Sequence, residues 1–163
     1  MAQVDYFLKV DGVEGESPDA KLAGQIPLLS WSWGETNSGS ESVGLGGGAG
    51  KVHMQDIHFT TQMGKHSVKL FLACASGQHI KKATLTCRKA GKDQQPFLVV
   101  NLAECFISSY QTGGSSGDAL IPIDQFSINF AEIKFEYKEQ KDDGTLGGVV
   151  PGGWNQKKNT AVA

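Results

Sequence analysis

A glycine-rich segment that ends in a lysine is the first part of the sequence whose residue types could do chemistry. A run of glycines leads to Gly50 and Lys51, which is similar to a loop that holds nucleotide phosphates with its backbone amides. That loop requires a glycine where this chain has Leu45, and a serine or threonine where it has Val52. It also requires a helix to follow, whereas a strand pattern follows here. The segment is therefore not predicted to bind a nucleotide.

The histidines do not form a metal-binding pattern. His53 and His58 are five residues apart in a strand pattern, which places them on opposite faces unless a bulge between them turns one side chain. No cysteine stands at ligand spacing beside these two, or beside His66 and His79. We expect all four histidines to be surface or partly buried structural residues, with no bound metal or cofactor.

The three cysteines, Cys74, Cys87 and Cys105, are an odd number without a close pair, which argues against a disulfide framework and a zinc ribbon. Each lies within an apolar run, where a reactive thiolate is disfavoured. The serine-rich segment at residues 115–116 lacks a nucleophile-elbow pattern, and the carboxylates at residues 142–143 lie in a polar tail. We therefore predict that the chain is not an enzyme.

Length and composition indicate a single globular domain that spans residues 1–163. The net charge of −2 gives no attraction to nucleic acid or to a membrane surface. No apolar run approaches the length of a membrane span. Asp5 and Lys9 interrupt the apolar N-terminal segment, which is therefore expected to be a strand and not a signal peptide.

Alternating apolar and polar residues predict about six strands. They fall at residues 4–10, 26–35, 51–62, 83–88, 97–109 and 126–138. The second strand should place Leu29, Trp31 and Trp33 in the core and Ser32 on the opposite face. The apolar phase changes near Asp56 and near Ala131, so a bulge or bend is expected at each. Residues from about 142 onward are predicted to be a glycine-rich, flexible tail.

One helix is predicted, at residues 65–76. Ser67 is the expected N-terminal cap and Gly77 the expected stop. A short apolar helix must dock on a sheet, because alone it is marginally stable in water. Its expected apolar stripe consists of Val68, Leu70, Phe71, Leu72 and Cys74. The predicted fold is mainly β: a closed β-barrel of two sheets, with the helix packed on its side and a long glycine-rich extended loop.

Eight stretches, in this order and spacing, resemble a known family from end to end. They are FLKVDGVEGES, LSWSWGETNSGS, GLGGGAGKVHMQDIHFTT, ACASGQHI, ATLTCRKAG, ISSYQTGGSSGD, FSINFAEIKFEYKEQ and GGWNQKKN. On these stretches the sequence resembles the haemolysin-coregulated protein (Hcp) family of bacterial type VI secretion systems.

The resemblance implies a β-barrel protein that assembles with itself into hexameric rings. Such rings stack into a tube, capped by a spike protein and propelled by a contractile sheath, and small effectors are carried or chaperoned in the lumen. The implied protein is made in the bacterial cytoplasm and leaves it without a cleaved signal peptide. It requires no cofactor, nucleic acid or membrane anchor.

The resemblance also implies roles for single positions. Ser32, between the two tryptophans, matches the family's lumen-facing position, where it would contact effectors. The glycine-rich arm matches the extended loop that makes contacts between subunits or rings. Its expected contact residues are Thr36, Ser38, Ser40, Glu41, Val43, Leu45, Gly46, Gly47, Gly48 and Lys51.

An alternative of a different class is a monomeric barrel that binds a small ligand in its interior. The inward positions argue against it, because Trp, Leu, Phe and Ile side chains would fill a small barrel. A ring predicts annular particles of hexameric mass, whereas a ligand-binding barrel predicts a compact monomer. A nucleotide-dependent enzyme is a more distant alternative, for the reasons given above.

Overall fold

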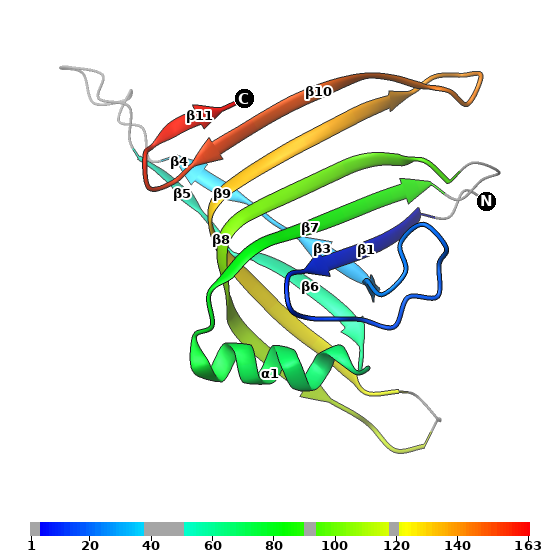
Figure 1. The fold of residues 1–163 in the computed structure, drawn as a ribbon, viewed down its shortest axis with the longest axis vertical. Helices are drawn as coiled ribbons and strands as arrows, with labels where there is room; N and C mark the ends of the chain where they lie inside the picture. Colours follow the sequence, from blue (N-terminus) through cyan, green and yellow to red (C-terminus); the bar gives the residue numbers. More distant parts are fainter. Residues whose placement is uncertain (1–3, 38–50, 90–93, 118–120) are drawn as a thin grey trace.

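The computed structural model describes residues 4–37, 51–89, 94–117 and 121–163, which form a strongly curved antiparallel sheet and one helix (Figure 1). The elements are β1 (Val4–Val10), β2 (Ile26–Leu28), β3 (Ser30–Ser32), β4 (Glu35–Asn37), β5 (Val52–Met54), β6 (Ile57–Gln62), α1 (His66–Ser76), β7 (Ile80–Lys89), β8 (Pro96–Gly113), β9 (Ile123–Gln140), β10 (Leu146–Asn155) and β11 (Thr160–Val162). The mainly β class and the helix are as predicted.

The nine-stranded sheet is organised around β8 and β9, which pair along most of their length. Its order is β11-β10-β9-β8-β7-β1-β2, and β6 branches from the first half of β9 to pair with β3. β4 and β5 form a separate two-stranded sheet. Figure 1 shows β8 and β9 bending about midway, so that their two halves belong to different walls of the sheet.

The predicted closed barrel is wrong, because the main sheet is open. Its hydrogen-bonded order ends at β11 and at β2, and no ladder between β2 and β6 is present among the described residues. The predicted strand at residues 26–35 is divided into β2, β3 and the start of β4. Leu29 separates β2 from β3. Its amide donates to the Thr60 carbonyl of β6 at 2.7 Å, and Thr61 Oγ1 of β6 donates to the Pro27 carbonyl of β2 at 2.6 Å. Leu29 is also 52% exposed instead of lying in the core, which interrupts the apolar face at this point.

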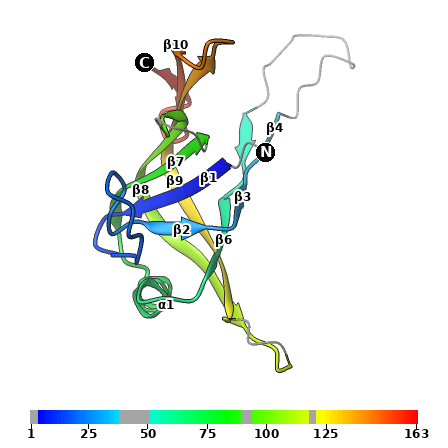
Figure 2. The same cartoon turned by 90° about the vertical axis from the view of Figure 1, so that its right-hand side faces the viewer.

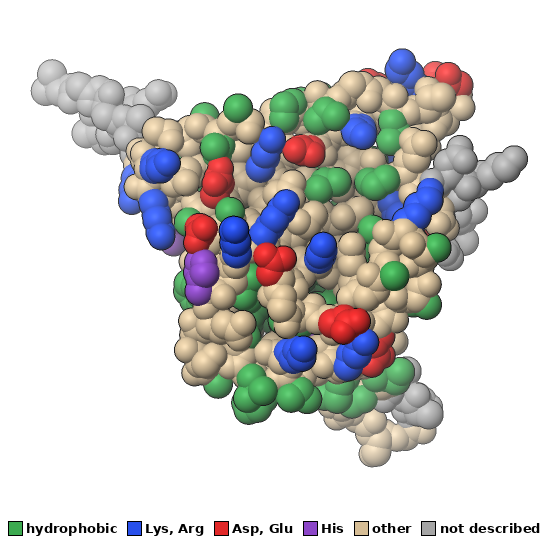
Figure 3. Space-filling model, in the orientation of Figure 1, with side chains coloured by type: hydrophobic (Ala, Val, Ile, Leu, Met, Phe, Trp, Pro, Cys, Tyr) green, Lys and Arg blue, Asp and Glu red, His purple; other side chains and the backbone are tan. Residues whose placement is uncertain are grey.

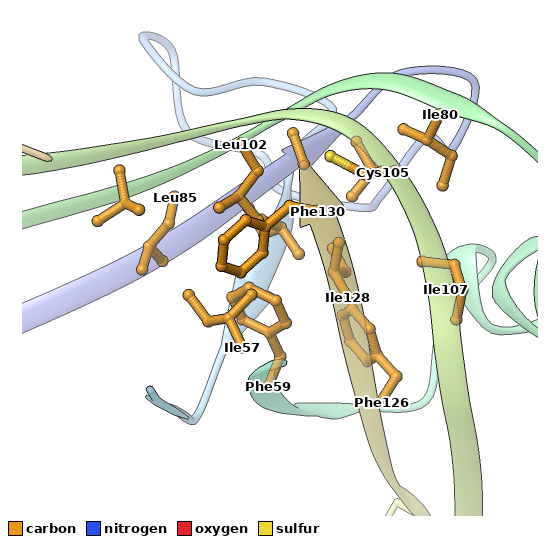
Figure 4. Close-up of a cluster of buried hydrophobic side chains, with 14 of the residues drawn as sticks. Ile57, Phe59, Ile80, Leu85, Leu102, Cys105, Ile107, Phe126, Ile128 and Phe130 are labelled. Atoms are coloured by element: carbon orange, nitrogen blue, oxygen red, sulfur yellow. The ribbon is translucent and has the colours of Figure 1, made fainter. Parts of the chain in front are cut away.

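The core fills the inside of the curved sheet (Figure 4). Phe59 of β6 and Phe126 of β9 stack with ring centroids 5.2 Å apart, and each is 1% exposed. Phe7 and Leu8 are both buried although they are consecutive, so β1 is covered on both faces. An interior filled in this way leaves the outer surfaces of the sheet as the places where function has to be sought.

The two predicted changes of phase have different structural forms. Residues 51–62 are not one bulged strand but β5 and β6, which pair with different partners on either side of Asp56. In β9, Phe130, Ala131 and Ile133 are all buried, so the buried phase changes where a bend was predicted. Opposite this point on β8, Glu104 has a φ of 54°, a left-handed conformation that is uncommon for a residue other than glycine.

The helix was predicted correctly in extent but not in its cap or its buried stripe. Gly77 ends α1 with a φ of 64°, as expected. Lys65, not Ser67, is the N-cap position, and Ser67 is buried in the first turn. The buried residues of α1 are His66, Ser67, Leu70 and Ala73. Val68, Phe71 and Leu72, which were expected in the buried stripe, are 63%, 52% and 53% exposed.

The segment from residue 142, which was predicted to be a flexible tail, contains β10 and β11. β10 pairs with β9 from Leu146 to Asn155, and β11 folds back on β10. Gly153 allows this pairing, because a Cβ at this position would lie 2.9 Å from the Ile133 carbonyl oxygen. The pairing therefore extends the sheet through a sequence that has little strand propensity of its own.

The surface carries charges of both signs, intermixed across the face shown in Figure 3. Hydrophobic side chains gather at the lower edge of this view, over α1. Within the described ranges, α1 is too short to span a membrane, and no other helix could do so.

Candidate functional site

A polar face covers the outside of the part of the sheet formed by β3, β6, β9 and β8. The strand registers place two rows of residues side by side across these four strands. One row consists of Ser32, His58, Ser127 and Ser109, and the other of Ser30, Thr60, Gln125 and Gln111. We call these eight residues the polar wall. None of them is Asp, Glu, Lys or Arg, and hydroxyl and amide side chains predominate.

A third row lies between these two rows, and its side chains point to the opposite face of the sheet. This row explains why the polar wall faces outward. It consists of Trp31, Phe59, Phe126 and Tyr110, which are buried in the core or pack against it. Neighbouring residues on a strand point to opposite faces, so a continuous aromatic row on the inside dictates the polar rows on the outside. The core therefore fixes the orientation of the polar wall.

Ser32 is exposed, and the tryptophans on either side of it are both held in place. The Trp33 ring lies 5.6 Å from that of Phe135, and its Nε1 donates to the Gln55 carbonyl at 2.9 Å. Trp31 packs against the core cluster. The predicted orientation of Ser32, opposite the packed tryptophans, is confirmed.

The hydroxyl groups at the centre of the polar wall bond to one another. Ser127 Oγ lies 2.8 Å from Ser108 Oγ and 2.5 Å from Ser109 Oγ. A register shift between Ile107 and Ser109 brings both β8 serines within reach of the same β9 residue. The serines at the centre of the face thus satisfy one another, and the face offers no carboxylate, lysine or arginine around which a specific small ligand could be ordered.

The predicted contact arm begins in β4 and ends at Lys51, the residue before β5. Thr36 and Lys51 are both exposed, and Thr36 is paired with His53. Figure 2 shows β4 projecting away from the helix end of the molecule. The other predicted contact residues, Ser38, Ser40, Glu41, Val43, Leu45, Gly46, Gly47 and Gly48, lie outside the described residues.

The residues considered for catalysis do not form an active site. Burial raises the pKa of Cys87 and of Cys105 to about 12, which keeps both thiols protonated at neutral pH. His53, His58 and His79 are exposed. Within the ranges that the structure covers, no group of three or more His, Cys, Asp or Glu side chains could hold a metal ion.

A buried polar cluster at the start of α1 was not predicted. Ser67 Oγ donates to Asp124 Oδ2 at 2.5 Å, and both residues are almost fully buried. His66 is buried beside them, so the expectation of a surface or partly buried side chain was wrong here. Burial lowers the pKa of His66, although the Asp124 carboxyl group and the backbone of Gln62 lie near its ring; neither ring nitrogen makes a hydrogen bond of standard geometry. Ser67 bonds directly to the carboxyl group and not to an imidazole, so this is not a catalytic triad.

The comparisons with known proteins agree on one family. Residues 7–137 match the family described as "Type VI secretion system effector, Hcp". Protein hcp1 of Pseudomonas aeruginosa is 45% identical over 158 residues, which cover 96% of this chain and 97% of that protein.

Two solved structures extend the agreement to the whole fold. A type six secretion system protein superposes with a TM-score of 0.93 at 31% identity, over 98% of this chain and 100% of the other. Hcp1 from Salmonella typhimurium superposes with a TM-score of 0.83 at 30% identity, over 99% and 100% of the two chains. The chain therefore belongs to the Hcp family of the type VI secretion system.

Proposed function

We propose that this chain is the inner-tube subunit of a type VI secretion system. Six copies form a ring, rings stack into a tube, and the tube carries or chaperones small effectors in its lumen. A spike protein caps the tube, and contraction of an outer sheath drives it outward. The chain supplies geometry and no chemistry, so it needs no cofactor and is not an enzyme.

The observation that carries this proposal is the uncharged polar wall, to which Ser32 contributes. A lumen through which different proteins pass should be wetted by water but should not bind any one of them tightly. Short hydroxyl and amide side chains meet this requirement, because they satisfy hydrogen bonds without presenting a fixed charge or a large apolar surface. We therefore assign the polar wall to the lumen, with Ser32 as an effector contact.

Exposed apolar side chains on α1 support assembly of the ring. Val68, Phe71 and Leu72 are each more than half exposed and belong to one short helix. Apolar residues gathered on a surface mark an interface more often than they remain in water. A ring forms when such a patch meets a different surface of the next copy and the rotation closes. The arm, from Thr36 to Lys51, is proposed to make further contacts with neighbouring subunits or rings.

We also propose that the protein is made in the bacterial cytoplasm and exported by this machine without a cleaved signal peptide. The pairing of β1 with both β2 and β7 supports this proposal, because removal of the N-terminal segment would take a strand with partners on both sides out of the sheet. The proposal requires neither nucleic acid nor a membrane anchor, in keeping with the net charge of −2.

The substitution Ser32→Gln tests the lumen assignment. We expect ring mass to be unchanged and effector retention to change, because the longer amide projects from an exposed position that the core does not use. The control is Ser116→Gln, which adds the same side chain in an exposed turn outside the polar wall. Ring mass is measured by size-exclusion chromatography with light scattering, and retention by co-purification of an effector. Loss of the ring in Ser32→Gln alone would show that Ser32 is structural.

A further inference from the structure

A pocket of about 380 Å³ lies where the base of the arm meets the far end of the main sheet. It is lined by Trp33, Glu35, Met54, Ile133, Phe135, Gly152, Gly153 and Trp154. These residues come from β4, β5, β9 and β10 and from the segment between β3 and β4. The pocket is separate from the polar wall, and one of the two occupants proposed below, a side chain of another copy, rests on the self-assembly proposed above.

The lining combines aromatic rings with one charge. Trp33, Phe135 and Trp154 are all partly buried and pack against the core cluster. Glu35 is exposed and, among the described residues, is the one charged residue in the lining. Aromatic rings beside a carboxylate form the environment that attracts an organic cation, through its charge and through its apolar methyl or methylene groups.

The hollow exists because β10 has a glycine where a side chain would fill it. Gly152 is paired with Phe135, and Trp154 with Ile133, so a side chain at Gly152 would lie on the same face as these three pocket residues. A Cβ built on Gly152 meets no atom within 4 Å. The space is therefore open, and a larger residue at this position could occupy it.

The hydrogen bonding around the pocket is incomplete. Trp154 Nε1 is buried and has no hydrogen-bond partner, whereas Trp33 Nε1 donates to Gln55. A buried donor without a partner costs free energy, and an ammonium or guanidinium group alone cannot offset that cost because it has no acceptor; a cation that also carries an oxygen atom, such as an amino alcohol, would.

We propose that this pocket binds an alkylammonium or guanidinium group, with Glu35 as the counter-ion and the rings of Trp33, Phe135 and Trp154 as its walls. The group belongs either to a small free cation or to a lysine or arginine side chain of another copy of this chain. Both sources use the same chemistry, and the following experiment separates them.

The free-cation arm uses choline and its neutral isostere 3,3-dimethylbutan-1-ol, with 19F NMR of the assembled protein labelled with 5-fluorotryptophan. Choline should shift the Trp33 and Trp154 resonances saturably and leave Trp31, which does not line the pocket, in place. The isostere should bind about fivefold more weakly, because it lacks the charge. Glu35→Gln should weaken choline binding by a similar factor, and Gly152→Leu should abolish it. Glu139→Gln, which removes an exposed carboxylate elsewhere, is the matched control.

The second arm applies if choline shifts no resonance of the wild type. If the occupant is a side chain of another copy, Glu35→Gln and Gly152→Leu should lower the assembled mass at fixed protein concentration. Glu139→Gln should not. Glu35 is exposed, so its variant keeps the test valid if Gly152→Leu does not fold. Equal binding of choline and its isostere would overturn the proposal. So would the absence of choline binding together with an unchanged assembled mass in all three variants.

Discussion

Removal of the Ser67 hydroxyl should destabilise the protein more than removal of any exposed hydroxyl group on the same helix. Ser67 Oγ accepts the Gly64 amide at 3.0 Å and donates to Asp124 Oδ2 at 2.5 Å. Ser67 is 4% exposed and Asp124 is 0% exposed, so water cannot replace the lost donor. The Tyr110 hydroxyl interacts with Ser67 and with the Asp124 carboxyl group, whose other oxygen makes no hydrogen bond of standard geometry.

These contacts set the expected size of the effect. A typical hydrogen bond contributes about 1 kcal/mol, and stranding a buried acceptor costs about 1–3 kcal/mol more. We therefore expect Ser67→Ala to lower the free energy of unfolding by about 3 kcal/mol, roughly a hundredfold in the folded-to-unfolded ratio. The urea midpoint should fall by about 1–2 M. Protein concentration is kept constant, because assembly contributes to apparent stability.

Ser76→Ala on the same helix is the control for this measurement. Its hydroxyl is exposed and makes one long bond, 3.5 Å to the Ala73 carbonyl oxygen. A surface change of this kind should cost no more than about 0.5 kcal/mol. If Ser67→Ala and Ser76→Ala had the same urea midpoint, the buried cluster would not anchor α1, and this reasoning would be refuted.

Three further predictions concern other parts of the structure. Two charge-assisted hydrogen bonds from the Arg88 guanidinium lower the pKa of Asp19 from 3.8 to about 2, so wild-type stability should fall as the pH drops through this window. Asp19→Asn should be less stable at pH 7 and show a flatter pH profile between these values; a urea-midpoint profile identical to that of the wild type would contradict this. The buried Cys87 and Cys105 should resist alkylation by iodoacetamide in the native state, whereas the partly exposed Cys74 should react first, as peptide mass spectrometry can establish. Gly77→Ala should lower the free energy of unfolding by about 1 kcal/mol, because a backbone φ of 64° disfavours a residue with a side chain. Thermal unfolding tests this prediction, and an unchanged melting temperature would disprove it.

The elements that the sequence predicted well are those whose own side-chain pattern favours the same conformation as their packing partners do. β1 lies where alternating apolar and polar residues predicted a strand, and α1 ends where Gly77 predicted its end. The closed barrel was predicted wrongly, in part because Leu29 is apolar and was expected in the core, whereas it is exposed and separates β2 from β3. β10 was not predicted because its glycines have low strand propensity. It forms because it pairs with β9.

The orientation of the candidate lumen residue was predictable because its tryptophan neighbours fixed the face. The rest of the polar wall was not, since Ser32 and Ser109 come into one row only through the registers of β3, β6, β9 and β8. The exposed helix residues were misassigned for a related reason. A sequence shows that Phe71 and Leu72 are apolar but not whether they are covered by this chain or by another one.

Native mass spectrometry, combined with negative-stain imaging of the purified protein, tests the central claim most directly. The account predicts closed rings with six times the chain's mass of 17.4 kDa, visible as annular particles. Solitary particles of a single chain's mass at high protein concentration would contradict it.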